Sequence, residues 1–294
     1  MKVGVAGLGM MGAAIAQRLI EVGHAVTVWN RSAGKLKPVV AAGATAAATP
    51  TVLAGACEVI VTILTDAAAI DAVYGGPEGL LAADVQGKLC VEMSTVQPAT
   101  ELALAEKVRR KGAAFVECPV GGTTGPARQG QLIGLLGAEP ADAARVEPLL
   151  RQMCRRLEHC GPVGAGSTMK LAINLPLMVS WQAFGEAFAL TRDLGIDPER
   201  LLSLFTDISA ATNAIKARAA MIAAELKGSG GGVTFTIDSG AKDLRTMAAE
   251  GRARGLELPL TERAAQCFEE ASRSGWGARD GSAVTAYWSK RGKL

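Results

Sequence analysis

A glycine-rich turn near the start of the chain restricts the possible folds more than any other feature of this sequence. Residues 7–12 read Gly-Leu-Gly-Met-Met-Gly, the G-x-G-x-x-G pattern, after an expected strand over Val3–Ala6 and before a helical pattern. In such a unit the first glycine permits a tight turn, the second lets the backbone approach a pyrophosphate, and the third allows the helix to pack closely on the strand. A plain strand–helix turn is the alternative. The pattern predicts a dinucleotide site made of Gly7, Leu8, Gly9, Met10, Met11 and Gly12.

Short apolar segments alternate with helical patterns along the first half of the chain. This alternation indicates a parallel sheet covered by helices. After Gly161-Pro162 the pattern is helical almost throughout. We expect an α/β fold: a Rossmann doubly wound parallel sheet over residues 1–162, then an all-α domain over 163–294, joined by a long helix from about residue 167 with an irregularity at Pro176. The expected strands are Val3–Ala6, Ala25–Trp29, Val59–Ile63, Leu89–Glu92, Ala114–Glu117, Leu132–Leu136 and Arg156–His159.

The end of the second expected strand bears on the choice of nucleotide. NAD sites usually place Asp or Glu there to bind the ribose 2′-hydroxyl, whereas this chain has Asn30-Arg31-Ser32, with Lys35 close behind. A carboxylate would repel a 2′-phosphate, but these side chains can donate hydrogen bonds to it, and Arg31 can stack on adenine. Charges that simply face solvent in a loop are the alternative. The segment predicts NADP(H).

Composition excludes several kinds of partner. The formal charge is only +3 and the basic residues are scattered, so neither a nucleic-acid partner nor a membrane surface is expected. No apolar run reaches the ~20 residues of a spanning helix, and the first residues do not resemble a signal peptide. The cysteines form no C-x-x-C, so no metal is expected. We expect a cytoplasmic protein, and the Ala-rich helical domain predicts a homodimer or homotetramer.

Lys170 and Asn174 stand four residues apart in the segment that opens the long helix, and therefore share one helical face. Their neighbours in sequence are apolar. A lysine that faces a partly dry cleft can exchange a proton near neutral pH, as a hydride-transfer enzyme requires. Most helical lysines are surface charges, so these residues alone leave both interpretations open.

Five segments, in order, resemble those of the β-hydroxyacid dehydrogenases, the family of 3-hydroxyisobutyrate dehydrogenase, tartronate semialdehyde reductase and glyoxylate/succinic semialdehyde reductases. The resemblance covers the whole chain. It involves the family's cofactor turn, D-x-S-T segment, A-P-V-S-G-G loop, G-x-G-x-x-x-K-x-x-x-N helix and late K-D-L. The matching residues are Gly7–Gly12, Glu92–Pro98, Cys118–Thr123, Gly164–Asn174 and Lys242–Leu244.

The resemblance implies roles for single residues. Lys170 would be the acid/base that takes the hydroxyl proton, and Asn174 would hold the lysine or the substrate. A substrate carboxylate would be bound by Ser94 and by the loop of Gly121, Gly122 and Thr123, whose amides can form an anion nest.

The cofactor's nicotinamide side would be approached by Thr95 and Lys242, with Leu64 and Thr65 lining the same cleft. Two structural alternatives stand beside these roles: Ser94 and Thr95 as a helix cap ahead of Pro98, and Lys242 as a local partner of Asp243.

Departures from the family pattern gather around the substrate. Gly121 replaces the family serine, Thr123 its second glycine, Glu92 an aspartate and Leu175 a second asparagine. The reaction class is unaffected, but the substrate is left open.

We therefore predict an NADP(H)-dependent β-hydroxyacid dehydrogenase that acts reversibly on a small 3-hydroxy carboxylate or its semialdehyde, in the manner of 3-hydroxyisobutyrate dehydrogenase. The alternatives are a glyoxylate/succinic semialdehyde reductase, an imine reductase, which usually lacks the lysine of this helix, and a non-catalytic NADPH-binding regulatory protein.

Overall fold

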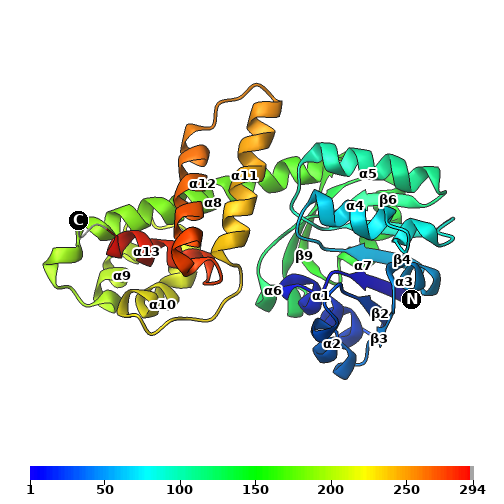
Figure 1. The fold of residues 1–294 in the computed structure, drawn as a ribbon, viewed down its shortest axis with the longest axis horizontal. Coiled ribbons are helices and arrows are strands. Elements are labelled where there is room, and N and C mark those ends of the chain that lie inside the picture. Colours follow the sequence, from blue (N-terminus) through cyan, green and yellow to red (C-terminus); the bar gives the residue numbers. More distant parts are fainter. Residues whose placement is uncertain (292–294) are drawn as a thin grey trace. The chain divides into compact units, whose positions relative to one another are not determined.

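The computed structural model describes residues 1–291, which divide into two compact units, residues 1–170 and the part from Leu171 onward (Figure 1). Residues 292–294, the end of the expected second domain, lie outside the described residues. Of these two units, the first holds the sheet and the second is helical. The expected fold class, a Rossmann sheet followed by helices, is confirmed.

One nine-stranded sheet organises the first unit, in the order β3-β2-β1-β4-β5-β6-β8-β7, with β9 paired to β8. All pairs from β3 to β6 are parallel, β8 is antiparallel to β6 and β7, and β9 is parallel to β8. Strand β2 lies on one side of β1, and β4 lies on the other side. The strand order therefore reverses between β1 and β4, and sheets of this kind bind ligands in the crevice at the carboxyl ends of two such strands. The strands are β1 (Lys2–Ala6), β2 (Ala25–Trp29), β3 (Thr45–Ala46), β4 (Val59–Thr62), β5 (Leu89–Glu92), β6 (Ala114–Glu117), β7 (Val120–Gly121), β8 (Leu132–Gly137) and β9 (Cys154–Gly161).

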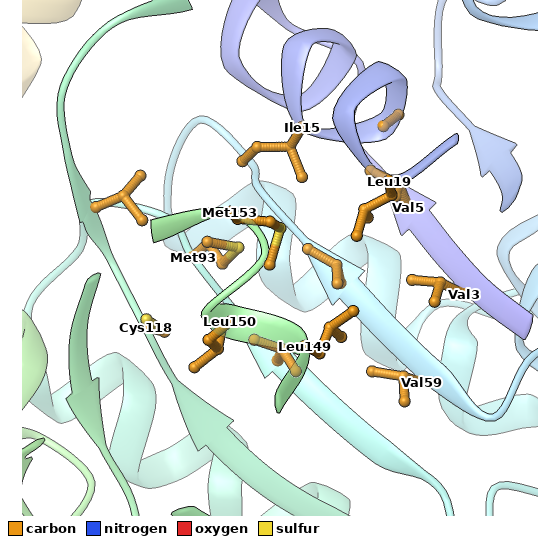
Figure 2. Close-up of a cluster of buried hydrophobic side chains, with 14 of the residues drawn as sticks. Val3, Val5, Ile15, Leu19, Val59, Met93, Cys118, Leu149, Leu150 and Met153 are labelled. Carbon is orange, nitrogen blue, oxygen red and sulfur yellow. The ribbon is translucent and has the colours of Figure 1, made fainter. Parts of the chain in front are cut away.

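Helices cover both faces of this sheet because the strand residues alternate between two buried cores. In β4, Val59 and Val61 belong to one core, which is drawn in Figure 2, while Ile60 belongs to the other. The first core is closed by α1 (Met10–Glu21), α2 (Lys37–Ala41) and α7 (Pro140–Leu150). The second is closed by α3 (Pro50–Ala56), α4 (Ala67–Gly75) and α5 (Pro98–Arg110). A short α6 (Thr124–Arg128) follows β7, and 3-10 turns lie at Ala33–Lys35 and Leu80–Ala82.

The long helix α8 (Ala165–Leu190) starts in the first unit and continues through Pro176 without interruption. It begins two residues before the expected start. The helical unit has its own core around Trp181, Phe188 and Phe268. No helix within residues 1–291 is both long and apolar enough to cross a bilayer. The other helices are α9 (Pro198–Asp207), α10 (Asn213–Lys227), α11 (Ile237–Ala253), α12 (Pro259–Ala271) and α13 (Val284–Lys290), with short turns at Arg192–Leu194, Ser272–Trp276 and Gly281–Ala283.

Candidate active site

In the turn after β1, backbone conformation and close packing require glycine at two positions. Gly7 has a φ of 99°, a conformation that side chains with a Cβ rarely adopt. A Cβ at Gly7 would also overlap the carbonyl oxygen of Ile63, which follows β4. At Gly12, a Cβ would overlap the carbonyl oxygen of Gly7. These two residues therefore let α1 start tightly against the end of β1.

Gly9 has no such structural reason to be glycine. Its φ is −65°, which any residue adopts, and no atom of the described residues lies within 4 Å of the place a Cβ would take. It is exposed and is the N-cap residue of α1, whose first turn contains no acidic side chain. Helix N-termini present unpaired amides and a positive dipole end that favour anions. The open space above Gly9 therefore fits the pyrophosphate of a dinucleotide.

This difference between two glycines gives a prediction. Gly9→Ala is expected to keep the melting temperature of the native chain while weakening NADPH binding by ~10-fold or more, since a methyl group would fill space that the phosphate needs. Gly12→Ala is expected to lower the free energy of unfolding by ~1–3 kcal/mol, because the methyl group has no room. Thermal melts and fluorescence titration with NADPH measure both. A Gly9→Ala protein that binds NADPH normally would contradict the proposed phosphate position.

Asn30 connects the glycine turn to the loop after β2. Its Oδ1 accepts a hydrogen bond from the Leu8 amide at 2.8 Å, and its Nδ2 donates to the Ser32 carbonyl at 3.1 Å. Sequence reasoning expected Asn30 to donate to a 2′-phosphate, but the structure uses both its oxygen and one of its N–H groups to hold two loops together. The exposed side chains of this segment are Arg31, Ser32 and Lys35.

The loops after β4 and β5 are tied to each other by buried polar groups. The Glu92 carboxylate accepts from the Ser94 amide at 2.7 Å and from the Thr62 hydroxyl, which also contacts the Tyr74 hydroxyl at 2.8 Å. The Ser94 hydroxyl in turn accepts from the Leu64 amide at 2.7 Å. Burial raises the pKa of Glu92 to about 7, against the hydrogen bonds from Ser94 and Thr62 that lower it.

This network changes the interpretation of Ser94. Its side chain is 1% exposed, and its oxygen already accepts the amide of Leu64. Ser94 therefore holds the loop that carries Leu64 and Thr65, and its contact with a substrate carboxylate stays a prediction. Thr95 is half-buried and Thr65 is exposed in these same loops.

Three buried glutamates lie at the carboxyl ends of the central strands. Glu92 and Glu117 are neighbours in register as the last residues of β5 and β6, and Glu101 joins them from the first turn of α5. All three have no exposed surface. The Glu101 carboxyl has no hydrogen-bond partner among the described residues. Burial, and then the charges of Glu92 and Glu117, raise the pKa of Glu101 well above its usual range.

The raised pKa of Glu101 predicts a pH-dependent cost in stability. A raised folded pKa means that the folded chain holds a proton that the unfolded chain releases above pH ~4.3. The free energy of unfolding therefore falls as pH rises, by about 1.4 kcal/mol per pH unit for one proton, until the folded pKa is passed. Glu101→Met removes this proton and also a buried carboxyl that has no hydrogen-bond partner among residues 1–291.

Thermal melts from pH 5 to pH 8 test this expectation. The Glu101→Met protein should melt above the native chain at pH 8, and the difference should shrink toward pH 5. Glu106→Met, at an exposed position of the same helix, is the control. Its difference in melting temperature from the native chain should not grow as pH rises. An unchanged or lower melting temperature of Glu101→Met at pH 8 would contradict this expectation, because it would mean that burying the Glu101 carboxyl does not destabilise the fold.

The chain after β6 contains Gly121, Gly122 and Thr123, for which the sequence predicts an anion nest. Gly121 ends β7 opposite Ile133, and a Cβ on it would make only ordinary contact with Ile133 at 3.6 Å. Gly122 has a φ of 123° and is exposed, so its glycine is required by the backbone. Thr123 is the N-cap residue of α6 but makes no side-chain cap bond. The fold therefore does not require glycine at position 121, because a side chain with a Cβ would fit there.

Lys170 is 7% exposed on α8. The alternative of a solvated surface lysine therefore does not describe it. Asn174 is half-buried one turn later, on the same face of the helix. Lys242 belongs to the helical unit, on α11, where its Nζ forms an ion pair with Asp243 Oδ1 at 2.5 Å. Its predicted contact with the cofactor stays a prediction.

The structure gathers most of the predicted residues at the carboxyl ends of strands in the first unit: the glycine turn, the loops at 30–35, 64–65 and 94–95, and the segment 121–123. Sequence reasoning missed the roles of Glu117 and Glu101 altogether. The available signal was an acidic residue at the end of an apolar strand, Ala114–Glu117, directly before Cys118-Pro119.

Comparisons with known proteins match both parts of the chain. Residues 2–161 match the family model described as the NAD binding domain of 6-phosphogluconate dehydrogenase. Residues 164–288 match the family model described as NAD-binding of NADP-dependent 3-hydroxyisobutyrate dehydrogenase.

Two curated relatives align with this chain over nearly their whole length. The 2-(hydroxymethyl)glutarate dehydrogenase of Eubacterium barkeri is 32% identical over 98% of this chain and 94% of its own. Glyoxylate/succinic semialdehyde reductase 1 of Arabidopsis thaliana is also 32% identical, over 97% of both chains. Among solved structures, a 3-hydroxyisobutyrate dehydrogenase from Salmonella typhimurium superimposes with a TM-score of 0.88 at 25% identity, covering 98% of this chain and 99% of that one.

Proposed function

The chain belongs to the β-hydroxyacid dehydrogenase family of NAD(P)-dependent oxidoreductases, and we propose that it transfers hydride reversibly between NADP(H) and a small 3-hydroxy carboxylate or its semialdehyde, in the manner of 3-hydroxyisobutyrate dehydrogenase. The observation that carries this proposal is the burial of Lys170 on α8, where it is 7% exposed. A lysine is seldom this buried unless it is paired or used. Its place in an apolar helix segment, with Asn174 one turn on, supports a role in proton transfer.

The proposed chemistry divides between cofactor and protein. When bound, NADP⁺ supplies the hydride acceptor for the alcohol carbon. Lys170 removes the hydroxyl proton in the oxidation direction and returns a proton to the carbonyl oxygen in reduction. Asn174 holds Lys170 or the substrate. The alcohol loses a hydride from carbon to the cofactor and a proton from its hydroxyl group to Lys170, and these two losses together account for the oxidation of CH–OH to a carbonyl group.

NADP(H) is the proposed cofactor over NAD(H). Gly9 and the start of α1 leave room for the pyrophosphate. The loop after β2 presents exposed Arg31, Ser32 and Lys35 and no carboxylate at the end of the strand, which favours a 2′-phosphate. The family model that matches residues 164–288 is described as belonging to an NADP-dependent enzyme. Thr95, Lys242, Leu64 and Thr65 are proposed to approach the nicotinamide side.

The proposed substrate is a small carboxylate held by the amides of Gly121 and Gly122, with Thr123 and Ser94 beside them. The relatives' names include a hydroxymethyl dicarboxylate dehydrogenase and a reductase of glyoxylate and succinic semialdehyde. We also propose a homodimer or homotetramer, because the helical unit exposes large apolar side chains, among them Leu190 at 88% and Leu260 at 70%.

A steady-state assay of NADPH oxidation at 340 nm tests this function. The substrates are methylmalonate semialdehyde, succinic semialdehyde, tartronate semialdehyde and glyoxylate, each repeated with NADH and set beside a cyclic imine. Turnover of one semialdehyde with a strong preference for NADPH is the expected result.

The other outcomes separate the alternatives. Turnover of glyoxylate and succinic semialdehyde alone would favour the reductase branch of the family, and faster turnover of the cyclic imine would favour an imine reductase. Tight NADPH binding without turnover of any compound would favour a regulatory protein and would overturn the proposed reaction.

A further inference from the structure

We propose that Glu117 is a positioning residue for Lys170: its carboxylate fixes the first turn of α8 and thereby the place of the lysine one turn later. This inference rests on the proposed function, since it gives Lys170 its importance. Glu117 itself is fully buried and touches neither substrate nor cofactor in this proposal.

The Glu117 carboxylate occupies the N-terminus of α8. Its Oε1 accepts from the Gly164 amide at 2.6 Å and the Gly166 amide at 2.9 Å, and its Oε2 accepts from the Ser167 amide at 3.2 Å. These are amides that a helix leaves without partners in its own first turn. A carboxylate with three amide donors at the positive end of a helix is a strong, directional clamp.

The remaining amides of this turn are also satisfied. The Ala165 amide donates to the Pro162 carbonyl at 3.0 Å, and the Thr168 amide donates to the Gly164 carbonyl at 3.1 Å. An external anion therefore finds no open amide between residues 164 and 168. Although helix N-termini commonly bind anions, α8 is closed by its own chain, so the substrate carboxylate must be bound elsewhere.

Two glycines make room for this clamp, and a third has the positive φ that its donating amide requires. A Cβ at Gly137, which pairs with Glu117 in the sheet, would overlap the Glu117 carboxylate. A Cβ at Gly166 would overlap the Leu135 carbonyl oxygen and come within 3.2 Å of Glu117 Oε1. Gly164 has a φ of 98°, which brings its amide to the carboxylate. The backbone on both sides is thus adapted to this one side chain.

Lys170 follows directly from the clamped turn. It stands four residues after Gly166 and three after Ser167, so it lies one turn above them on the same side of the helix. Because a helix is stiff, a shift or rotation of its first turn displaces Lys170 with it. A misplacement of about 1 Å at a reacting group can lower a rate by ~100-fold. A cap that only stabilised the fold would have no such selective effect on turnover.

Glu117→Gln is the first test, because it keeps the size of the side chain but turns an N–H group toward the Ser167 amide. We expect kcat to fall by ~10- to 100-fold, with NADPH affinity and the substrate KM within about 3-fold of the native values, as for a loss confined to the transition state. Asp197→Asn is the matched control. One oxygen of Asp197, Oδ1, caps α9 by accepting from the amides of Glu199 at 3.0 Å and Arg200 at 3.4 Å. Asparagine keeps such an oxygen and caps helices about as well, so removing the carboxylate charge at this helix N-terminus should leave both kcat and the melting temperature near the native values.

A double-mutant cycle with Lys170→Ala separates positioning from stability. If Glu117 acts through Lys170, adding Glu117→Gln to Lys170→Ala should slow turnover by less than about 2-fold, since the lysine it positions is already gone. A full further loss in the double variant would overturn the proposal, as would native kcat in Glu117→Gln alone. Normal turnover of Lys170→Ala would instead contradict the proposed function itself.

Glu117→Asp covers the case in which the glutamine variant does not fold. It keeps the charge on a shorter side chain, and it should fold with a kcat between those of the native and the glutamine proteins. Failure of both variants to fold would assign Glu117 to stability alone and overturn the positioning role.

Discussion

Lys170→Ala is expected to lower kcat for NADPH-dependent reduction by ~100-fold or more, which is the usual contribution of general acid–base catalysis. The affinity for NADPH should remain within about 2-fold, because the change removes a proton donor and no proposed cofactor ligand. Single-turnover and steady-state rates at saturating NADPH, with fluorescence titration for the cofactor, measure the two quantities separately.

Met169→Ala is the control for Lys170→Ala. Met169 is the preceding residue of α8 and is 43% exposed, so its truncation changes the same turn of the helix on another side. It should leave kcat near the native value. A Lys170→Ala protein with near-native turnover would remove this lysine from the proposed mechanism, whereas a loss of NADPH binding in step with kcat would point to a damaged fold.

Arg31→Ala should raise the KM for NADPH by ~10- to 100-fold, the range expected for a lost charge-assisted hydrogen bond of about 1.5–3 kcal/mol. The KM for NADH should change little, since NADH has no 2′-phosphate. The preference for NADPH would then shrink without any change in the reaction catalysed. Initial rates against both cofactors at saturating substrate give the ratio directly.

Lys37→Ala provides the comparison for Arg31→Ala. Lys37 is an exposed cation at the start of α2, just beyond the Arg31–Lys35 segment, and its removal lowers the positive charge of the region by the same amount. It should leave the KM for NADPH nearly unchanged. Equal effects of both substitutions on NADPH and NADH would mean that Arg31 acts only through general charge or solvation.

Periodicity in the sequence was sufficient for most of the fold. The seven predicted strands are present with ends shifted by no more than two residues, because each is an apolar segment flanked by turn residues. The strands β3 and β7 were missed. Each has only two residues, too few to form an alternating pattern, and each exists only because a neighbouring strand offers it hydrogen bonds.

In the candidate site, too, the features set by nearby residues could be predicted, and the contacts between distant residues could not. The glycine turn could be predicted because the positive φ of Gly7 and the close approach of Gly12 to the Gly7 carbonyl are requirements within six residues of the chain. The prediction for Asn30 was incomplete, because its partner Leu8 lies 22 positions away in sequence. Ser94 likewise meets Leu64 across 30 positions.

By itself, the sequence determined seven of the strands, where the glycine turn lies and which reaction family the chain belongs to, because these depend on local spacing and on motifs of a few residues. Only the tertiary structure decided that Glu117 clamps the start of α8, that Glu101 is buried with no hydrogen-bond partner in the described part of the chain, and that Ser94 ties two loops. The reason is physical: burial raises the energy of an ionised group and makes each hydrogen bond to it matter. Burial and bonding partners are set by strands and helices that meet from distant parts of the chain.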